Sequence, residues 1–190
     1  GADAVRKVYN GNGVAWAIQD KQLGTGHAVL CAQEAYDGFS GAVMILSGDV
    51  PLIQEQTLRA LIERHRSRKA AVTLLTAILE EPRGYGRILR DARGHLTGIV
   101  EEKDATEEQR KIREVNAGAY VVAAPFLFAA LSEVKNHNRQ GEYYLPDIVG
   151  IGLRQKAMIE TVRVEDGREI AGVNSREELA FMEKNLRQSI

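Results

Sequence analysis

Short apolar runs alternate along this chain with segments in which apolar residues recur at helical spacing. The runs are rich in β-branched residues and are bounded by Gly, Pro and polar clusters, a pattern typical of buried strands. The segments between them carry apolar positions three and four residues apart, as helices with one buried face do. Strands are predicted at residues 14–18, 42–46, 70–79, 87–90, 95–100, 114–122 and 157–164. Helices are predicted at residues 2–8, 28–36, 56–68 and 105–113, from Pro125, through Ile148 and Leu153, and from Ser175 to the C-terminus.

This alternation of strands and helices predicts an α/β fold, in which a Rossmann-like mixed sheet, mainly parallel, is flanked by helices. Residues 91–94 are Asp-Ala-Arg-Gly and lie between two strand patterns, which predicts a hairpin turn. A chain of 190 residues has the length of one domain, so we expect a single domain over residues 1–190.

Composition and charge narrow the class of partner. Hydrophobic residues make up 44% of the chain and charged residues 27%, which is ordinary for a soluble globular protein. With 25 Lys and Arg against 26 Asp and Glu, the net charge is -1, so neither nucleic acid nor an anionic membrane is expected as a partner. No apolar stretch is long enough to span a bilayer and nothing resembles a signal peptide, so a cytoplasmic protein is expected.

Residues that carry nucleophilic or zinc chemistry are sparse. Cys31 is the single cysteine and falls in a predicted helix, so no internal disulfide and no cysteine nucleophile are expected. The four histidines have unrelated spacings, with no i, i+4 pair that suits zinc. No Gly-x-Ser-x-Gly elbow occurs. A zinc site and a nucleophilic hydrolase are therefore both disfavoured.

The strand predicted at residues 42–46 is followed by Ser47, Gly48 and Asp49. In open α/β sheets, ligands bind just outside the carboxyl ends of the strands, which is where Asp49 is expected. Gly48 has no Cβ and allows the backbone to approach a ligand. The alternative is a simple Gly-Asp turn, with Asp49 bonded to its own backbone.

A polar loop at residues 19–26 precedes the next predicted helix. Gly24 and Gly26 flank Thr25 at the helix N-terminus, where free N–H groups favour an anionic or polar ligand. Gln19 and Gln22 supply amides that both donate and accept, as recognition of a planar base edge requires. An ordinary helix N-cap explains the same glycines equally well.

Three more candidates stand beside strands or in glycine-rich loops. Gly86 belongs to a loop with an aromatic residue, and either turn geometry or close approach to a ligand accounts for it. Glu101 follows an apolar strand directly and is the member of its charge run that is able to point into a site. Asn116 lies near the start of a strand, close to Gly118.

Taken in order, these motifs resemble bacterial N-acetylglucosamine-1-phosphate uridylyltransferases, the pyrophosphorylase half of the bifunctional enzymes that make UDP-N-acetylglucosamine. The resemblance extends from the first predicted strand to the last helix. The motifs that carry it are Gln-Leu-Gly-Thr-Gly-His at 22–27, Leu-Ser-Gly-Asp-Val-Pro-Leu-Ile at 46–53, Gly-Tyr-Gly-Arg-Ile at 84–88, Ile-Val-Glu-Glu-Lys-Asp-Ala at 99–105, Asn-x-Gly at 116–118, Gly-Glu-Tyr-Tyr at 141–144 and Gly-Val-Asn at 172–174.

The resemblance implies roles for the positions that match. It implies a nucleotide-diphospho-sugar transferase fold, with Asp49 and Asn174 as the protein ligands of Mg²⁺ and as the catalytic pair. The positions that it assigns to the uracil are Gln19, Gly24 and Thr25. Those that it assigns to the rest of the nucleotide pocket and to the N-acetylglucosamine side are Ser47, Gly48, Gly86, Glu101, Asn116 and Asn174.

The implied reaction needs no nucleophilic side chain. An oxygen of N-acetylglucosamine 1-phosphate attacks the α-phosphorus of UTP in line, UDP-N-acetylglucosamine forms, and pyrophosphate leaves. One carboxylate and one amide oxygen suit Mg²⁺, which keeps several waters and phosphate oxygens as its other ligands. The resemblance also implies a role in bacterial peptidoglycan and lipopolysaccharide synthesis, and a homo-oligomer in the full-length protein.

The chain departs from the family at its beginning. The family opens with a strand and a Leu-Ala-Ala-Gly-x-Gly-Thr-x-Met loop, followed by a lysine after a proline, and these are absent from the sequence. The C-terminal β-helix acetyltransferase domain is absent as well. We therefore expect an N-terminally truncated domain that lacks its first βα unit. Two alternatives stay open: a nucleotide-sugar-binding fragment without turnover, and a related pyrophosphorylase with another sugar or nucleotide.

Overall fold

The computed structural model describes residues 2–8, 13–173, 175 and 180. Its centre is a six-stranded sheet with the order β4-β3-β5-β2-β6, and β1 also pairs with β5. The ten-residue β5 pairs through Val115 with β3 and through its last four residues with β1. The strands are β1 Ala42–Ile45, β2 Val72–Ile78, β3 Arg87–Arg90, β4 Leu96–Val100, β5 Glu114–Ala123 and β6 Ile159–Arg163.

The sheet is mixed, as the strand and helix pattern predicts, but it is not mainly parallel, because four of the five pairings among the described strands are antiparallel. Strands β1, β2, β3 and β6 run in one direction, whereas β4 and β5 run in the other. Because β5 lies between the strands of the first group, the pairing of β2 with β6 is the one parallel pairing among the described strands.

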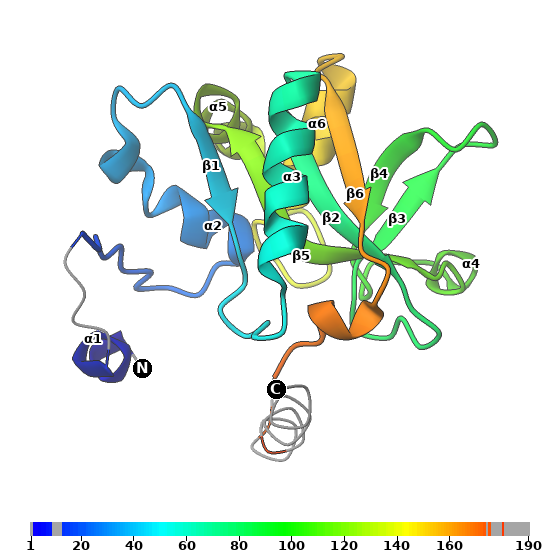
Figure 1. Ribbon diagram of the computed structural model, residues 1–190, viewed down its shortest axis with the longest axis horizontal. Coiled ribbons are helices and arrows are strands. Elements are labelled where there is room, and N and C mark those ends of the chain that lie inside the picture. The colour runs from blue at the N-terminus through cyan, green and yellow to red at the C-terminus, as the bar shows by residue number, and fades with distance from the viewer. Residues whose placement is uncertain (1, 9–12, 174, 176–179, 181–190) are drawn as a thin grey trace.

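Helices cover both faces of this sheet. Helix α3 lies across one face in Figure 1, and α5 and α6 lie on the other. The helices are α1 Ala2–Val8, α2 Thr25–Leu30, α3 Glu55–Arg68, α4 Glu107–Arg110, α5 Ala124–Glu133 and α6 Asp147–Arg154, with short 3₁₀ helices at Gln33–Tyr36 and Gly167–Ile170. Within the described residues, no helix is both long and apolar enough to cross a membrane.

Two hydrophobic cores result from the alternation of side chains along the central strands. On β5, Val115 and Val121 pack with Leu61 of α3 in one core, while Tyr120 and Val122 face α5 and α6 in the other. Strand β2 contributes to both cores in the same alternating way. The face of the sheet that carries Tyr120 also carries Asn116, and the candidate site lies on this face.

Most of the predicted elements are confirmed, and their bounds shift by a few residues. The helix predicted at 28–36 begins earlier, at Thr25, because Gly24 takes the positive φ of 107° that starts it, and it ends at Leu30. The helix predicted at 105–113 is the single turn α4, which Thr106 and Gln109 close with a capping box. The helix predicted from Ser175 onward falls largely outside the described residues.

The strand predicted at residues 14–18 is wrong. This segment belongs to no sheet of the described residues, and Val14, Trp16 and Ile18 are 40%, 44% and 51% exposed. An alternating pattern identifies residues that fit a sheet, but a strand also requires a neighbouring strand to pair its backbone.

Replacing Leu61 with alanine should lower the free energy of unfolding by about 2–5 kcal/mol, because Leu61 is 0% exposed and its loss leaves a cavity beneath the sheet. Chemical denaturation followed by circular dichroism measures this change. Arg59→Ala, which removes an exposed ion pair with Glu55 on the same helix, is the control and should change stability by less than about 1 kcal/mol. Equal effects in the two variants would contradict the packing described for α3.

Candidate functional site

The glycine-rich turn at the start of α2 is held against residues 142–145. The Gly26 N–H donates to the Tyr143 carbonyl at 2.8 Å, and the Leu145 N–H donates to Thr25 Oγ1 at 3.0 Å. A Cβ on Gly24 would lie 2.6 Å from the Tyr143 carbonyl oxygen, so a side chain at this position would push the two segments apart. The glycine is therefore needed for the close approach as well as for its positive φ.

Gln19 stabilises the same turn from the other side. Its Nε2 donates to the Gly24 carbonyl at 3.0 Å and lies 2.9 Å from Nδ1 of His27. The structure therefore gives Gln19 a role in shaping the loop. Its predicted contact with a base stays a prediction.

A pocket of about 260 Å³ opens beside this turn, at the ends of β1 and β4 and alongside β5. Thr25, Ser47, Glu101 and Asn116 all line it, although the sequence separates them widely. Four of the predicted site residues are thus brought together. Apolar side chains cover much of the remaining wall, namely Ala28, Val29, Ile45, Leu46, Leu145 and Pro146.

Hydrogen bonds fix Asn116 at the inner end of the pocket, where it is 8% exposed. Its Nδ2 donates to the Tyr120 hydroxyl at 2.6 Å, and its Oδ1 accepts from the Gly118 N–H at 3.2 Å. Its backbone N–H donates to the Gly86 carbonyl at 2.9 Å. Asn116 therefore joins β5 to the loop before β3, and both of its side-chain polar atoms have partners.

Strand β5 bulges at this point. Between Asn116 and Tyr120 it covers four residue steps, while β2 covers two, from Thr76 to Leu74. Gly118 lies in the bulge with a φ of 74°, and a Cβ there would come within 2.9 Å of Ser47 Oγ. Bulges commonly redirect side chains next to active sites. Here the bulge brings β5 against the turn that carries Ser47.

Glu101 contributes a carboxyl group to the pocket. Its carboxylate leans on Gly86, where a Cβ would lie 3.0 Å from Glu101 Oε1. Burial raises the pKa of Glu101, and the negative charges of Asp147, Asp104 and Glu142 raise it further, while Arg87 opposes them. A carboxyl group whose pKa is raised by burial and by neighbouring negative charges is typical of functional sites.

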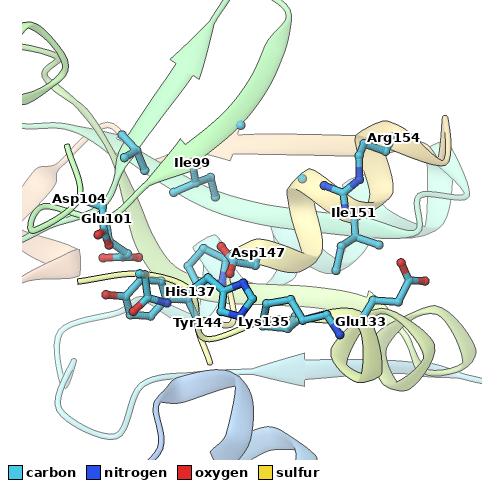
Figure 2. Close-up of a pocket in the computed structure, with 16 residues that line it drawn as sticks. Ile99, Glu101, Asp104, Glu133, Lys135, His137, Tyr144, Asp147, Ile151 and Arg154 are labelled. Carbon is cyan, nitrogen blue, oxygen red and sulfur yellow. The ribbon is translucent and has the colours of Figure 1, made fainter. Parts of the chain in front are cut away.

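A second, larger cavity of about 440 Å³ adjoins the first, and Glu101 lines both. Figure 2 shows Glu101 and Asp104 near one end of it and Arg154 and Lys135 toward the other. Asp147, at the start of α6, lies between them in this view, and its pKa is raised by burial and by Asp104.

The remaining predicted residues lie outside these cavities. Gly48 and Asp49 are exposed in the turn after β1. The Val173 N–H donates to the Asp49 carbonyl at 2.8 Å, so the end of the described chain runs beside this turn. Asn174, the next residue, lies outside the described residues. Within those residues, no three His, Cys, Asp or Glu side chains converge as a metal-binding group.

Sequence reasoning missed Tyr120 and Asp147 as members of the two cavities. Tyr120 follows Asn116 by an even number of residues in the same predicted strand, which is the signal for a shared face. Asp147 follows Pro146 at the start of a predicted helix, a common place for an acidic residue. Nothing in the local pattern points to its cavity.

Comparisons with known proteins bear on the family and the fold of this chain. Residues 4–163 match the family model described as nucleotidyl transferase. The bifunctional protein GlmU of Geobacter metallireducens is 51% identical over 190 residues, covering 100% of this chain and 40% of that protein. GlmU of Geotalea daltonii is 47% identical over 180 residues, covering 94% of this chain and 39% of that protein. The chain thus spans about two fifths of the length of these relatives.

The fold is shared with a solved structure of UDP-glucose pyrophosphorylase complexed with UDP-glucose. The TM-score is 0.63 at 15% sequence identity, and the match covers 90% of this chain and 66% of that one. At this identity the likeness concerns the fold alone.

Replacing Glu101 with glutamine should stabilise the fold at neutral pH, because the raised pKa of Glu101 makes its ionised form unfavourable in the folded state. At a pH below the unfolded-state pKa, both states hold the proton and the penalty vanishes. As pH rises, the unfolded chain ionises first, and the penalty is complete above the folded-state pKa. Melting temperatures at pH 4 and pH 7.5 test this. The gain of Glu101→Gln over wild type should grow with pH, and a pH-independent difference would refute it.

Proposed function

Since this chain belongs to the nucleotidyl transferase family, we propose that it forms the uridylyltransferase part of a protein that makes UDP-N-acetylglucosamine and pyrophosphate from UTP and N-acetylglucosamine 1-phosphate. The observation that carries this proposal is the convergence of Thr25, Ser47, Glu101 and Asn116 on one pocket. The GlmU relatives, which match across nearly the whole chain, support the choice of reaction.

The size and lining of this pocket suit one sugar ring. Its volume of about 260 Å³ is slightly below the roughly 300–1,000 Å³ usual for the pockets of drug-sized ligands, as a site for one ring would be. Glu101 is able to accept hydrogen bonds from sugar hydroxyl groups, and Ser47 is able to donate or accept. The apolar wall, which includes Leu145 and Pro146, suits the methyl group of an acetamido substituent.

The nucleotide would lie toward the turn at the start of α2. Gly24 and Thr25 form this turn, and the bonds to Tyr143 and Leu145 hold its backbone in place. A base that stacks on or bonds to this turn would meet a preformed surface, which lowers the entropy cost of binding. Gln19, bonded to the Gly24 carbonyl, would act by keeping the turn in shape.

The chemical step depends on positioning. An oxygen of the sugar phosphate forms a bond to the α-phosphorus of UTP, while the bond from that phosphorus to the bridging oxygen of pyrophosphate breaks. The residues of this chain orient the two substrates, and no side chain forms a covalent intermediate. Holding reactants in line accounts for a large part of the rate in reactions of this class.

Asp49 and Asn174 would hold Mg²⁺. The exposed carboxylate of Asp49 fits this ion, which takes one or two protein oxygens and otherwise keeps water and phosphate ligands. The hydrogen bond from the Val173 N–H to the Asp49 carbonyl brings the end of the described chain to the same turn. Mg²⁺ when bound neutralises the charge that builds up on the phosphates. A cytoplasmic role in cell-wall precursor synthesis belongs to the same proposal.

An activity assay on the full-length protein that carries this chain tests the proposed reaction directly. Incubated with Mg²⁺, UTP and N-acetylglucosamine 1-phosphate, the protein should release pyrophosphate and form UDP-N-acetylglucosamine. Replacing UTP by dTTP, GTP or CTP, or the sugar by glucose 1-phosphate, should reduce the rate. A higher rate with another nucleotide and sugar phosphate would assign a different substrate specificity. Binding of UDP-N-acetylglucosamine without turnover would show that the protein binds nucleotide sugars but does not catalyse the reaction.

Asp49→Ala should weaken Mg²⁺-dependent binding of UDP-N-acetylglucosamine by at least about tenfold, because the site loses its carboxylate ligand. Isothermal titration calorimetry with and without Mg²⁺ measures this. The matched control is Asp37→Ala, which removes another exposed aspartate that lines neither cavity. Wild-type affinity in Asp49→Ala would remove Asp49 from the metal site.

A further inference from the structure

Arg87, the first residue of β3, is a charged residue in the interior. It is 2% exposed, although arginine is rarely buried without partners. It lies next to Gly86 in the chain and opposite Val100 and Val115 in the sheet. Arg87 thus lies where the start of β3 meets the end of β4 and the start of β5.

Three segments bind this guanidinium group. Its Nη2 forms an ion pair with Glu102 Oε2 at 2.6 Å, which ties it to the end of β4. Its Nε and Nη2 donate to the Arg110 carbonyl in α4 at 3.4 and 3.3 Å. Its Nη1 donates to the Tyr85 carbonyl in the loop before β3.

Two of these three anchors, Tyr85 and Glu102, are next in sequence to Gly86 and Glu101, which were predicted as site residues. Tyr85 precedes Gly86, whose carbonyl accepts from the Asn116 N–H. Glu102 follows Glu101, whose carboxylate rests on Gly86. Glu101 and Glu102 are consecutive, yet the first lines the pocket while the second pairs with Arg87. A shift of the guanidinium group would therefore move Gly86 and Glu101 together.

We propose that Arg87 is a positioning residue for the sugar-phosphate half of the site: its guanidinium group clamps the 85–86 loop to the end of β4 and so fixes the Glu101 carboxylate. This role rests on the proposed function. The planar fork of arginine binds a carboxylate and two carbonyls at once, in directions that a single ammonium group does not reproduce. Arg87 touches no substrate position itself, because it does not line either cavity.

Arg87 also acts on the charge of Glu101. Asp104, Asp147 and Glu142 surround Glu101 with negative charge, and among the groups that shift the pKa of Glu101, Arg87 is the one that lowers it. Removing the Arg87 charge should therefore raise the pKa of Glu101 further, whereas lysine at this position preserves the charge and disturbs only the geometry. The two effects are separable by substitution.

The first experiment compares Arg87→Lys with Arg90→Lys in the full-length protein. Arg90 lies on the same strand and pairs with Glu114 at 2.6 Å, away from both cavities. Arg87→Lys should raise the KM for N-acetylglucosamine 1-phosphate roughly ten- to a hundredfold, as small misplacements of positioning groups do, and leave the KM for UTP unchanged. Glu102→Gln, a milder change at a side chain that is 27% exposed, should raise the same KM less.

A merely structural role would give a different result. If Arg87→Lys lowers the melting temperature but changes neither KM, or raises both equally, the positioning role is overturned. If wild type itself forms no product, the proposed function fails, and the second experiment still decides the link between Arg87 and Glu101.

That second experiment follows the ¹³C shift of the Glu101 carboxyl carbon during a pH titration. The apparent pKa of Glu101 should rise in Arg87→Met and remain near the wild-type value in Arg87→Lys and Arg90→Met. Circular dichroism establishes that each variant is folded. Identical titration of Glu101 in folded Arg87→Met and in wild type would refute the electrostatic part of the role.

Discussion

The ten residues of β5 pack a hydrophobic core with one face and line the candidate pocket with the other. The rest of the structure depends on this division. One face of the strand buries Val115 and Val121 against α3, while the other presents Asn116 and Tyr120 to the candidate pocket. A slip of one residue would exchange the two faces completely. The hydrophobic side therefore fixes the register, and the register in turn sets the polar side in place.

The polar groups on that second face are arranged so that most have partners before any ligand arrives. Asn116 bonds to Tyr120, to Gly118 and to Gly86, and such a network is rigid because each unpaired member would be costly in a low-dielectric interior. Glu101 is the exception in the pocket, since burial and neighbouring carboxylates work against its charge. A site of this kind gives up stability at the one group that is kept available for a ligand.

The elements with strong local signals could be predicted from the sequence. The helix at 56–68 and the strands at 70–79 and 114–122 were recognisable because periodicity is a property of consecutive residues. Residues 14–18 have the same alternation, but pairing depends on a neighbour that the local pattern does not contain. Of the site residues, Thr25, Ser47, Glu101 and Asn116 were predicted from a family resemblance, which already contains the three-dimensional arrangement. Arg87 was not singled out, because two of its hydrogen-bond acceptors are backbone carbonyls. Every residue has a carbonyl, so the sequence does not indicate which of them accept from Arg87.

The close approach of Gly24 to Tyr143 constrains how the sequence of this protein can evolve. Two loops separated by more than a hundred positions share one interface, where a backbone carbonyl occupies the space of a missing side chain. A substitution in one loop changes which side chains fit in the other loop, so the effects of substitutions in the two loops are epistatic. Under the proposed function, in which the nucleotide lies toward one loop and the sugar pocket includes residues of the other, the two specificities would therefore evolve together.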